Sequence, residues 1–215
     1  MTKRRVTLTF DNGPTPAVTE RVLDILAGRR IVTTFFVIGA KINESTADLL
    51  RQAHAAGHWI GNHTLSHTTA LGDRPEREYA LSEIDGAQQR IGNFSHPEKL
   101  FRPYGNSGRL GPHLLSQAAL SHLLAEKYRT VTWNSVPGDW KDPDGWVDNC
   151  MAQISALEWS VVVLHDIEGG CLAHLPELLR RLDDIGVTFE QDFPDAVTLT
   201  RAGQIVSLPT DYVAA

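Results

Sequence analysis

Short apolar runs alternate with helical patterns along most of this chain, and the alternation limits the folds that it can adopt. The predicted strands are rich in β-branched or aromatic residues and cover 6–10, 33–38, 59–60, 100–101, 130–133, 160–164 and 187–189. The predicted helices repeat apolar residues every three or four positions and cover about 19–27, 45–57, 77–91, 112–124, 146–154 and 175–185. Strands of this kind that alternate with helices favour a parallel sheet covered by helices, either a (β/α) barrel or an open doubly wound sheet.

The composition predicts one globular domain and argues against several classes of protein. The 215 residues can build one well-filled core, so we expect a single domain over 1–215. A net charge of −6 without a block of basic residues argues against a nucleic-acid partner and against an anionic membrane surface. No apolar run approaches the roughly 20 residues of a membrane span. The oligomeric state is not predicted.

The start of the chain and its two cysteines bear on the cellular compartment. Folded structure is expected from about residue 5, with no signal peptide before it, so the sequence as given predicts a cytoplasmic protein. Cys150 and Cys171 lie in unlike contexts and form no C-x-x-C motif. We therefore expect both to be reduced thiols.

Polar residues follow the carboxyl ends of five predicted strands. In parallel sheets of either kind, chemistry gathers at these ends. The residues that follow the first, third, fourth, fifth and sixth strands are, in this order, Asp11, His63 with His67, Arg102 with Tyr104, Asp139, and His165. This clustering predicts an active site.

A pair of histidines indicates a metal ion in that site. His63 and His67 are four residues apart, a spacing that places two side chains on one face of a helical turn, so both rings are expected to bind one ion. A metal hydrolase also needs a base that takes a proton from the activated water and an acid for the leaving group. On mechanism alone, a residue near Asp11 would complete the metal site, an unliganded carboxylate would be the base, and His165 would be the acid.

Six motifs stand in a fixed order along the chain. They are TFDNGP (9–14), TTFFVIG (33–39), GHWIGNHTLSH (57–67), FRPYG (101–105), GDW (138–140) and LHD (164–166). Over about residues 5–190 the chain resembles the polysaccharide deacetylases, which form carbohydrate esterase family 4 and include the nodulation-type chitooligosaccharide deacetylases. The resemblance implies a distorted (β/α) barrel and metal-dependent removal of N- or O-acetyl groups from a small or oligomeric saccharide. Zn²⁺ is the expected ion, with Co²⁺, Ni²⁺ and Mn²⁺ as alternatives.

The resemblance also implies catalytic roles for five residues. Asp11 would be the general base, oriented by Arg102, and His165 would be the general acid, held by Asp139. Tyr104 would stabilise the oxyanion through its backbone N–H and contact the substrate.

Metal and substrate contacts are implied for five further residues. Asn12, His63 and His67 would bind the ion. Leu164 would line a pocket for the acetyl group, and Trp140 would pack beside the acid and contact the substrate.

At three positions the sequence departs from the family pattern. Asn12 and Val136 stand where the family usually has aspartate, and the motif that contains Arg102 is one residue shorter than usual. Because a neutral amide attracts a cation less than a carboxylate does, we expect weaker metal binding. Two alternatives to a saccharide deacetylase therefore stay open. One is a hydrolase of a small non-sugar amide or cyclic imide on the same scaffold, and the other is a catalytically weakened protein that binds a saccharide or a partner.

Overall fold

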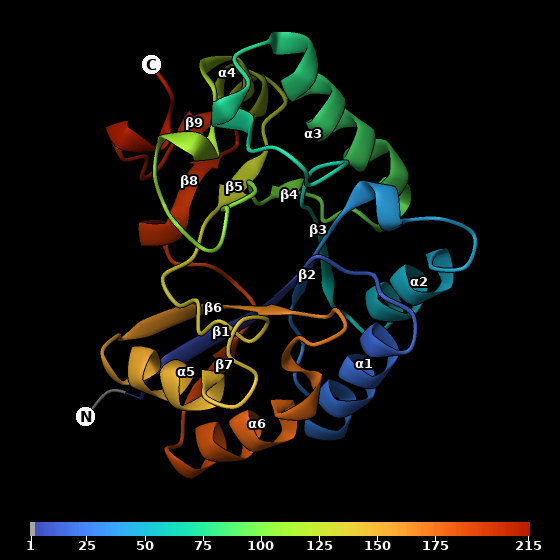
Figure 1. Cartoon of the computed structure of the whole chain (residues 1–215), viewed down its shortest axis with the longest axis vertical. Helices are drawn as coiled ribbons and strands as arrows, with labels where there is room; N and C mark the ends of the chain where they lie inside the picture. The colour runs from blue at the N-terminus through green and yellow to red at the C-terminus, as the bar shows by residue number, and fades with distance from the viewer. Residues whose placement is uncertain (1–2) are drawn as a thin grey trace. The chain divides into compact units, whose positions relative to one another are not determined.

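The computed structural model of the chain describes residues 3–215 and divides into two compact units, which are described separately (Figure 1). Within the described residues, the first unit comprises 3–35, 44–59 and 133–193, and the second comprises 36–43, 60–132 and 194–215. Two strands, β2 (Thr34–Val37) and β3 (Trp59–Asn62), begin in the first unit and end in the second.

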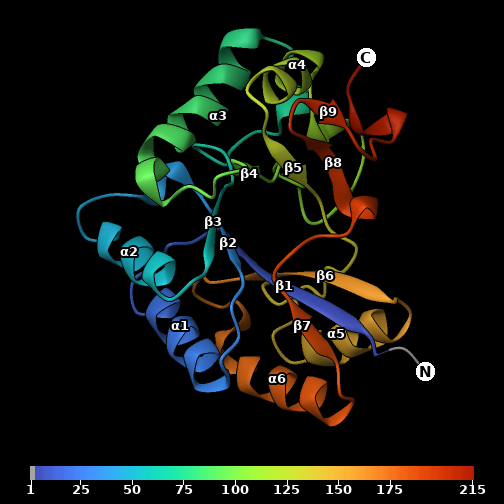
Figure 2. The same cartoon turned by 180° about the vertical axis from the view of Figure 1, so that it is seen from behind.

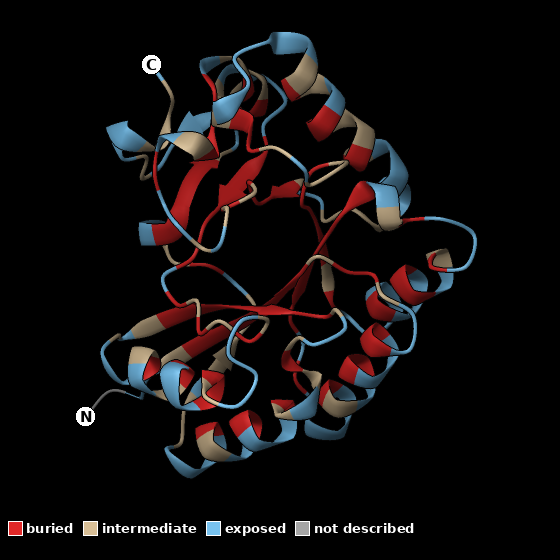
Figure 3. Ribbon diagram, viewed as in Figure 1, coloured by how far each residue is buried: buried red, intermediate tan, exposed pale blue. Residues whose placement is uncertain are grey.

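The first unit is built around strand β1 (Arg5–Asp11). Its other elements are β6 (Trp159–His165), β7 (Thr188–Glu190), α1 (Val18–Arg29), α2 (Ala47–Ala55), α5 (Trp146–Ser155) and α6 (Leu175–Asp184). Strand β1 pairs in parallel with β6 along its whole length and with β7 over residues 5–7, and Figure 2 shows β7 beside it. Strands β1 and β6 are buried almost throughout (Figure 3), so both the threonines that alternate with apolar residues in β1 and the continuous apolar run of β6 are shielded from solvent.

Helix α6 illustrates how the helices of this unit are stabilised. It packs against α1 and α5, and its four leucines recur at the spacing of one helical face. The leucines, all fully buried, are Leu175, Leu178, Leu179 and Leu182. Burial of each contributes roughly 1.5–3 kcal/mol. The leucine repeat alone therefore accounts for the helix predicted over 175–185.

The second unit contains antiparallel strands that the sequence does not predict. Its remaining elements are β4 (Leu100–Phe101), β5 (Arg129–Val131), β8 (Thr198–Arg201), β9 (Gln204–Ile205), α3 (Arg77–Ile91) and α4 (Gln117–Ala125). Strands β3, β4 and β5 run parallel, but β8 runs antiparallel to β5, and β9 to β8. The prediction of a parallel sheet is therefore wrong here. A turn with positive φ at Ala202 and Gly203 reverses the chain between two strands too short to show a pattern.

The helix boundaries follow the sequence closely, with one exception. Helix α3 coincides with its prediction. The helix expected over 112–124 is instead a 3₁₀ turn at Pro112–Leu114 followed by α4. It divides because the Ser116 side chain accepts a hydrogen bond from the N–H of Ala119 at 3.2 Å and so begins a new helix.

Two further expectations concern single residues and membrane helices. Cys150 and Cys171 are buried free thiols, as predicted. In the part of the chain that the structure describes, no helix has both the length and the apolar character that a membrane crossing requires.

Candidate active site

The segment 63–67, called the histidine loop below, follows β3 in the second unit and is not helical. The N–H of His67 donates to the Thr64 side-chain oxygen at 3.2 Å. Thr64 and His67 have φ of 67° and 53°, in the left-handed region. The predicted helical turn is therefore wrong. Contacts from outside the loop decide its conformation, among them the hydrogen bond from the Gly39 N–H to the Thr64 carbonyl at 2.9 Å.

The two imidazoles of the loop nevertheless lie side by side, with ring centroids 4.7 Å apart. Nδ1 of the buried His63 lies 2.8 Å from the backbone carbonyl oxygen of Arg102. Because a carbonyl oxygen only accepts hydrogen bonds, Nδ1 carries a proton and donates this bond. Metal-ligating histidines are usually oriented by such a bond from the other ring nitrogen, so His63 fits a metal site.

The complete predicted donor set contains an amide. Among residues 3–215 no group of three or more His, Cys, Asp or Glu is arranged to hold a metal ion. The predicted set of His63, His67 and Asn12 has only two members of those types. An amide oxygen can bind a divalent ion, so the chemistry of the set is compatible with one.

Arg102 and Tyr104 lie near the histidine loop in the second unit. The Arg102 side chain is fully buried; its guanidinium donates to the Thr132 carbonyl at 3.1 Å and lies 4.1 Å above the Phe36 ring. The Tyr104 ring is 4.2 Å from that of His67. The structure thus places the Tyr104 ring beside His67 and the Arg102 carbonyl against His63.

In the first unit, Asp11 and His165 end neighbouring parallel strands. They are direct partners in the register of β1 with β6, and both are buried. Asn12 follows Asp11 with φ of 74°, a left-handed conformation that asparagine tolerates better than most residues. The expectation that polar residues gather at strand ends therefore holds for this pair.

His165 and Asp139 form a buried pair with two hydrogen bonds. The His165 backbone N–H and its Nδ1–H each donate to one oxygen of Asp139, both at 2.8 Å. Burial alone would lower the pKa of His165. The hydrogen bond and charge of Asp139, with the charges of Asp11 and Asp166, outweigh burial and raise that pKa above its usual value. His165 therefore holds a proton more firmly than an ordinary histidine does.

The two predicted substrate contacts of this unit flank the same pair. The Trp140 ring meets the His165 ring edge-on, with centroids 4.5 Å apart, as expected for a residue that packs beside the acid. Leu164 is fully buried in β6. Its predicted place in an acetyl pocket stays a prediction.

Sequence reasoning missed the contacts of Asp166. This buried carboxylate accepts a hydrogen bond from the Thr19 hydroxyl at 2.6 Å. It also lies against Gly13, where an added Cβ would come within 2.1 Å of a carboxylate oxygen. Gly13 belongs to the first motif and Asp166 to the last. Their joint presence was a signal that the two segments touch.

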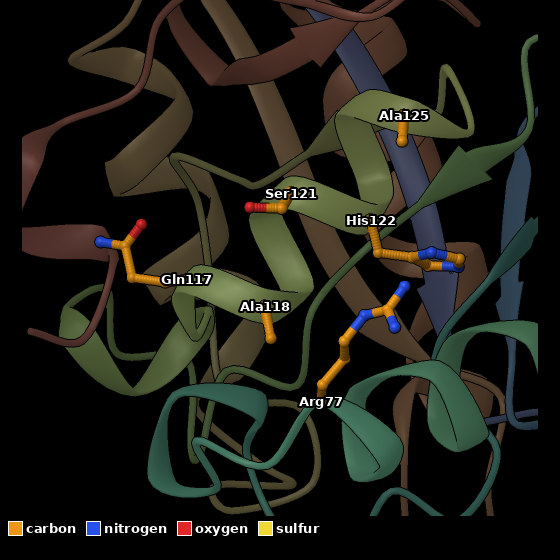
Figure 4. A pocket seen from close by; sticks show the side chains of 6 residues that line it. All are labelled: Arg77, Gln117, Ala118, Ser121, His122 and Ala125. Carbon is orange, nitrogen blue, oxygen red and sulfur yellow. The ribbon is translucent and has the colours of Figure 1, made fainter.

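A groove in the second unit lies between the start of α3 and one side of α4 (Figure 4). Its lining consists of Arg77, Gln117, Ala118, Ser121, His122 and Ala125. His122 is engaged with Asp85, since its Nε2 lies 2.7 Å from that carboxylate. None of the predicted site residues lines this groove.

Comparison with known proteins identifies one family. The model of the polysaccharide deacetylase family matches residues 1–120. A chitooligosaccharide deacetylase from Rhizobium leguminosarum bv. trifolii is 34% identical over 170 residues, which are 78% of this chain and 73% of the relative.

Solved structures give the same result for the fold. A peptidoglycan N-acetylglucosamine deacetylase is similar with a TM-score of 0.75 at 22% identity, over 94% of this chain and 92% of the other. A family 4 acetyl xylan esterase from Clostridium thermocellum, solved with a cobalt ion, has a TM-score of 0.69 at 26% identity, over 87% and 88%. The predicted fold class is confirmed, because the chain has the α/β fold of these deacetylases.

Proposed function

Because the chain belongs to the polysaccharide deacetylase family, a family of hydrolases, we propose that it removes acetyl groups from N-acetylated or O-acetylated saccharides in a metal-dependent reaction. The orientation of His63 carries this proposal, since its Nδ1 is bonded to a backbone carbonyl, the arrangement that usually orients a metal-ligating histidine. The name of the Rhizobium relative favours an acetylated chitooligosaccharide as the substrate.

His63 and His67 would hold the metal ion, with Asn12 as a third, neutral ligand. A divalent ion supplies Lewis acidity, which polarises a carbonyl group and lowers the pKa of a water molecule. Zn²⁺ suits two imidazoles and an oxygen ligand, and Co²⁺, Ni²⁺ and Mn²⁺ are the alternatives.

His165 would act as the general acid and Asp11 as the general base. As water adds to the acetyl carbonyl carbon, Asp11 takes a proton from it. As the carbon–nitrogen bond breaks, Nε2 of His165 gives its proton to the leaving nitrogen, so that acetate and a free amine result. Asp139 supports this role, because its bond to Nδ1 aims Nε2 and its charge raises the pKa of His165, which favours the protonated imidazole.

The remaining predicted residues would position the reacting groups. The Tyr104 backbone N–H would bind the oxyanion. Arg102 would orient Asp11, and Leu164 would line the acetyl pocket. Trp140, whose ring packs on His165, would contact the sugar.

Asn12 is the observation that favours a second function. A ligand set without a carboxylate has less charge to hold a divalent ion, so the chain could bind a saccharide or a partner without turnover. A small non-sugar amide or cyclic imide is an alternative substrate for the same proposed chemistry.

Metal content tests the proposal directly. The freshly purified protein should contain one equivalent of a transition metal by elemental analysis. His63→Ala should lose it, and His54→Ala, at an exposed position of α2, should keep it. The metal-loaded protein should then release acetate from acetylated chitooligosaccharides. Protein that takes up no Zn²⁺ even when incubated with excess would refute the hydrolase proposal and favour a binding protein.

A further inference from the structure

Glu83 of α3 is a buried carboxylate whose partners lie in the histidine loop. Its residue is 4% exposed, and acidic side chains are almost never buried without partners. One carboxylate oxygen accepts the backbone N–H of Ser66 at 2.9 Å, and the other accepts the Ser66 hydroxyl at 2.7 Å. Both donors belong to the residue just before His67.

A second side chain ties the same helix to the same loop. Asn62 is fully buried; its amide group donates to the Ile84 carbonyl of α3 at 2.8 Å. Its oxygen accepts the N–H of Thr64 at 2.9 Å. Two adjacent residues of α3, Glu83 and Ile84, therefore fix the loop at two points on either side of Leu65.

The loop conformation needs such support. Thr64 and His67 both adopt left-handed backbone conformations, which non-glycine residues keep only where the surroundings determine them. The loop also packs closely on α3, because a Cβ added at Gly86 would lie 2.8 Å from the Leu65 side chain. A hydrogen bond to the Ser66 N–H fixes the peptide plane one residue before His67. The direction of the His67 side chain therefore depends on it.

We propose that Glu83 is a positioning residue that holds the histidine loop in the conformation in which His67 binds the metal ion. The inference rests on the proposed function, because it takes His63 and His67 as the ligands. Glu83 does not touch the ion or the substrate. It acts through Ser66, the residue directly before His67.

The test is the Zn²⁺ affinity of the apoprotein, measured by competition with a chromogenic chelator. Glu83→Ala should weaken Zn²⁺ binding about 10- to 100-fold, the usual effect of losing a supporting residue. Glu83→Gln should weaken it less, because its one amide oxygen can still accept the Ser66 N–H. Glu78→Gln, at an exposed position of the same helix, is the matched control and should bind as the wild type does.

Amide hydrogen exchange of Ser66 gives a second readout that needs no metal. Exchange should accelerate in Glu83→Ala, and less in Glu83→Gln. If Ser66 exchanges faster while Zn²⁺ affinity stays at the wild-type value, Glu83 only stabilises the fold and the inference is wrong. If Glu83→Ala does not fold, the comparison of Glu83→Gln with Glu78→Gln decides in the same way. A wild-type protein that binds no Zn²⁺ would refute the proposed function itself, and with it the role of Glu83.

Discussion

The stability of the protein should fall in mild acid because of one buried histidine. His58 is 4% exposed, and its Nδ1 accepts the backbone N–H of Thr33 at 3.1 Å. Its ring also meets Phe35 edge-on at 5.2 Å. Burial lowers the pKa of His58 from 6.5 to about 4. A protonated ring carries hydrogen on both nitrogens and cannot accept the Thr33 N–H. The loss of this hydrogen bond also opposes protonation of His58 in the folded state.

The sign and size of the effect follow from the two pKa values. Between pH 6.5 and 4 the unfolded state binds the proton and the folded state does not, so the free energy of unfolding falls as the pH falls. A difference of 2.5 pKa units corresponds to about 3 kcal/mol, all of it lost only below pH 4. At pH 5 about 2 kcal/mol should already be lost relative to pH 7.5.

Urea unfolding of the wild type and of His58→Gln at pH 7.5 and pH 5 measures this loss in the free energy of unfolding. The glutamine does not titrate, so the loss between the two pH values should be about 2 kcal/mol smaller in the variant. His54→Gln, at an exposed position of α2, is the matched control and should lose as much as the wild type. If the wild type and His58→Gln lose equal stability, His58 is not the group that carries the acid sensitivity.

Three further predictions concern the site. Asn12→Asp should tighten Zn²⁺ binding because it adds a carboxylate, and equal affinity by competition titration would show that residue 12 is not a ligand. Asp139→Asn should lower the pKa of His165, so the alkaline limb of the kcat/KM profile for acetylated chitooligosaccharide should move to lower pH; an unmoved limb would exclude His165 as the acid. Gly13→Ala should reduce the free energy of unfolding by about 1–3 kcal/mol, since the new methyl group meets the Asp166 carboxylate, and urea unfolding at the wild-type value would contradict that contact.

The sequence predicts most of the first unit because local patterns decide it. The leucine repeat of α6, the alternation of apolar residues and threonines in β1 and the apolar run of β6 leave little choice of element. Once these strands are parallel neighbours, residues at their carboxyl ends must meet. The sequence therefore predicts that Asp11 and His165 lie at the same edge of the sheet, whereas their direct pairing follows from the position of β6 beside β1. A single domain over 1–215 and a cytoplasmic location stay predictions.

The conformation of the histidine loop could not be predicted, because long-range contacts decide it. A spacing of four residues is compatible with a helical turn, but it does not require one. The hydrogen bonds that the loop makes with Val37 and Gly39 come from a segment more than 20 residues away in the sequence. The strand β8 was missed for a similar reason, since it is defined by its antiparallel pairing with β5 and not by its own four residues.

A charge on the buried face of a helix is a signal that periodicity alone overlooks. The sequence suggests an apolar face of α3 through Tyr79, Leu81, Ile84 and Ala87. The structure buries Ile84 and Ala87 but not the first two, and its buried face also contains Ala80 and Glu83. The helix period places Glu83 on one face with these two alanines, and a glutamate in such a position needs a buried partner. The pattern therefore predicts that α3 contacts a polar segment of the chain. Only the fold identifies that segment as the histidine loop. The motif that contains the two histidines therefore could not predict that Glu83, on another element, supports the proposed metal site.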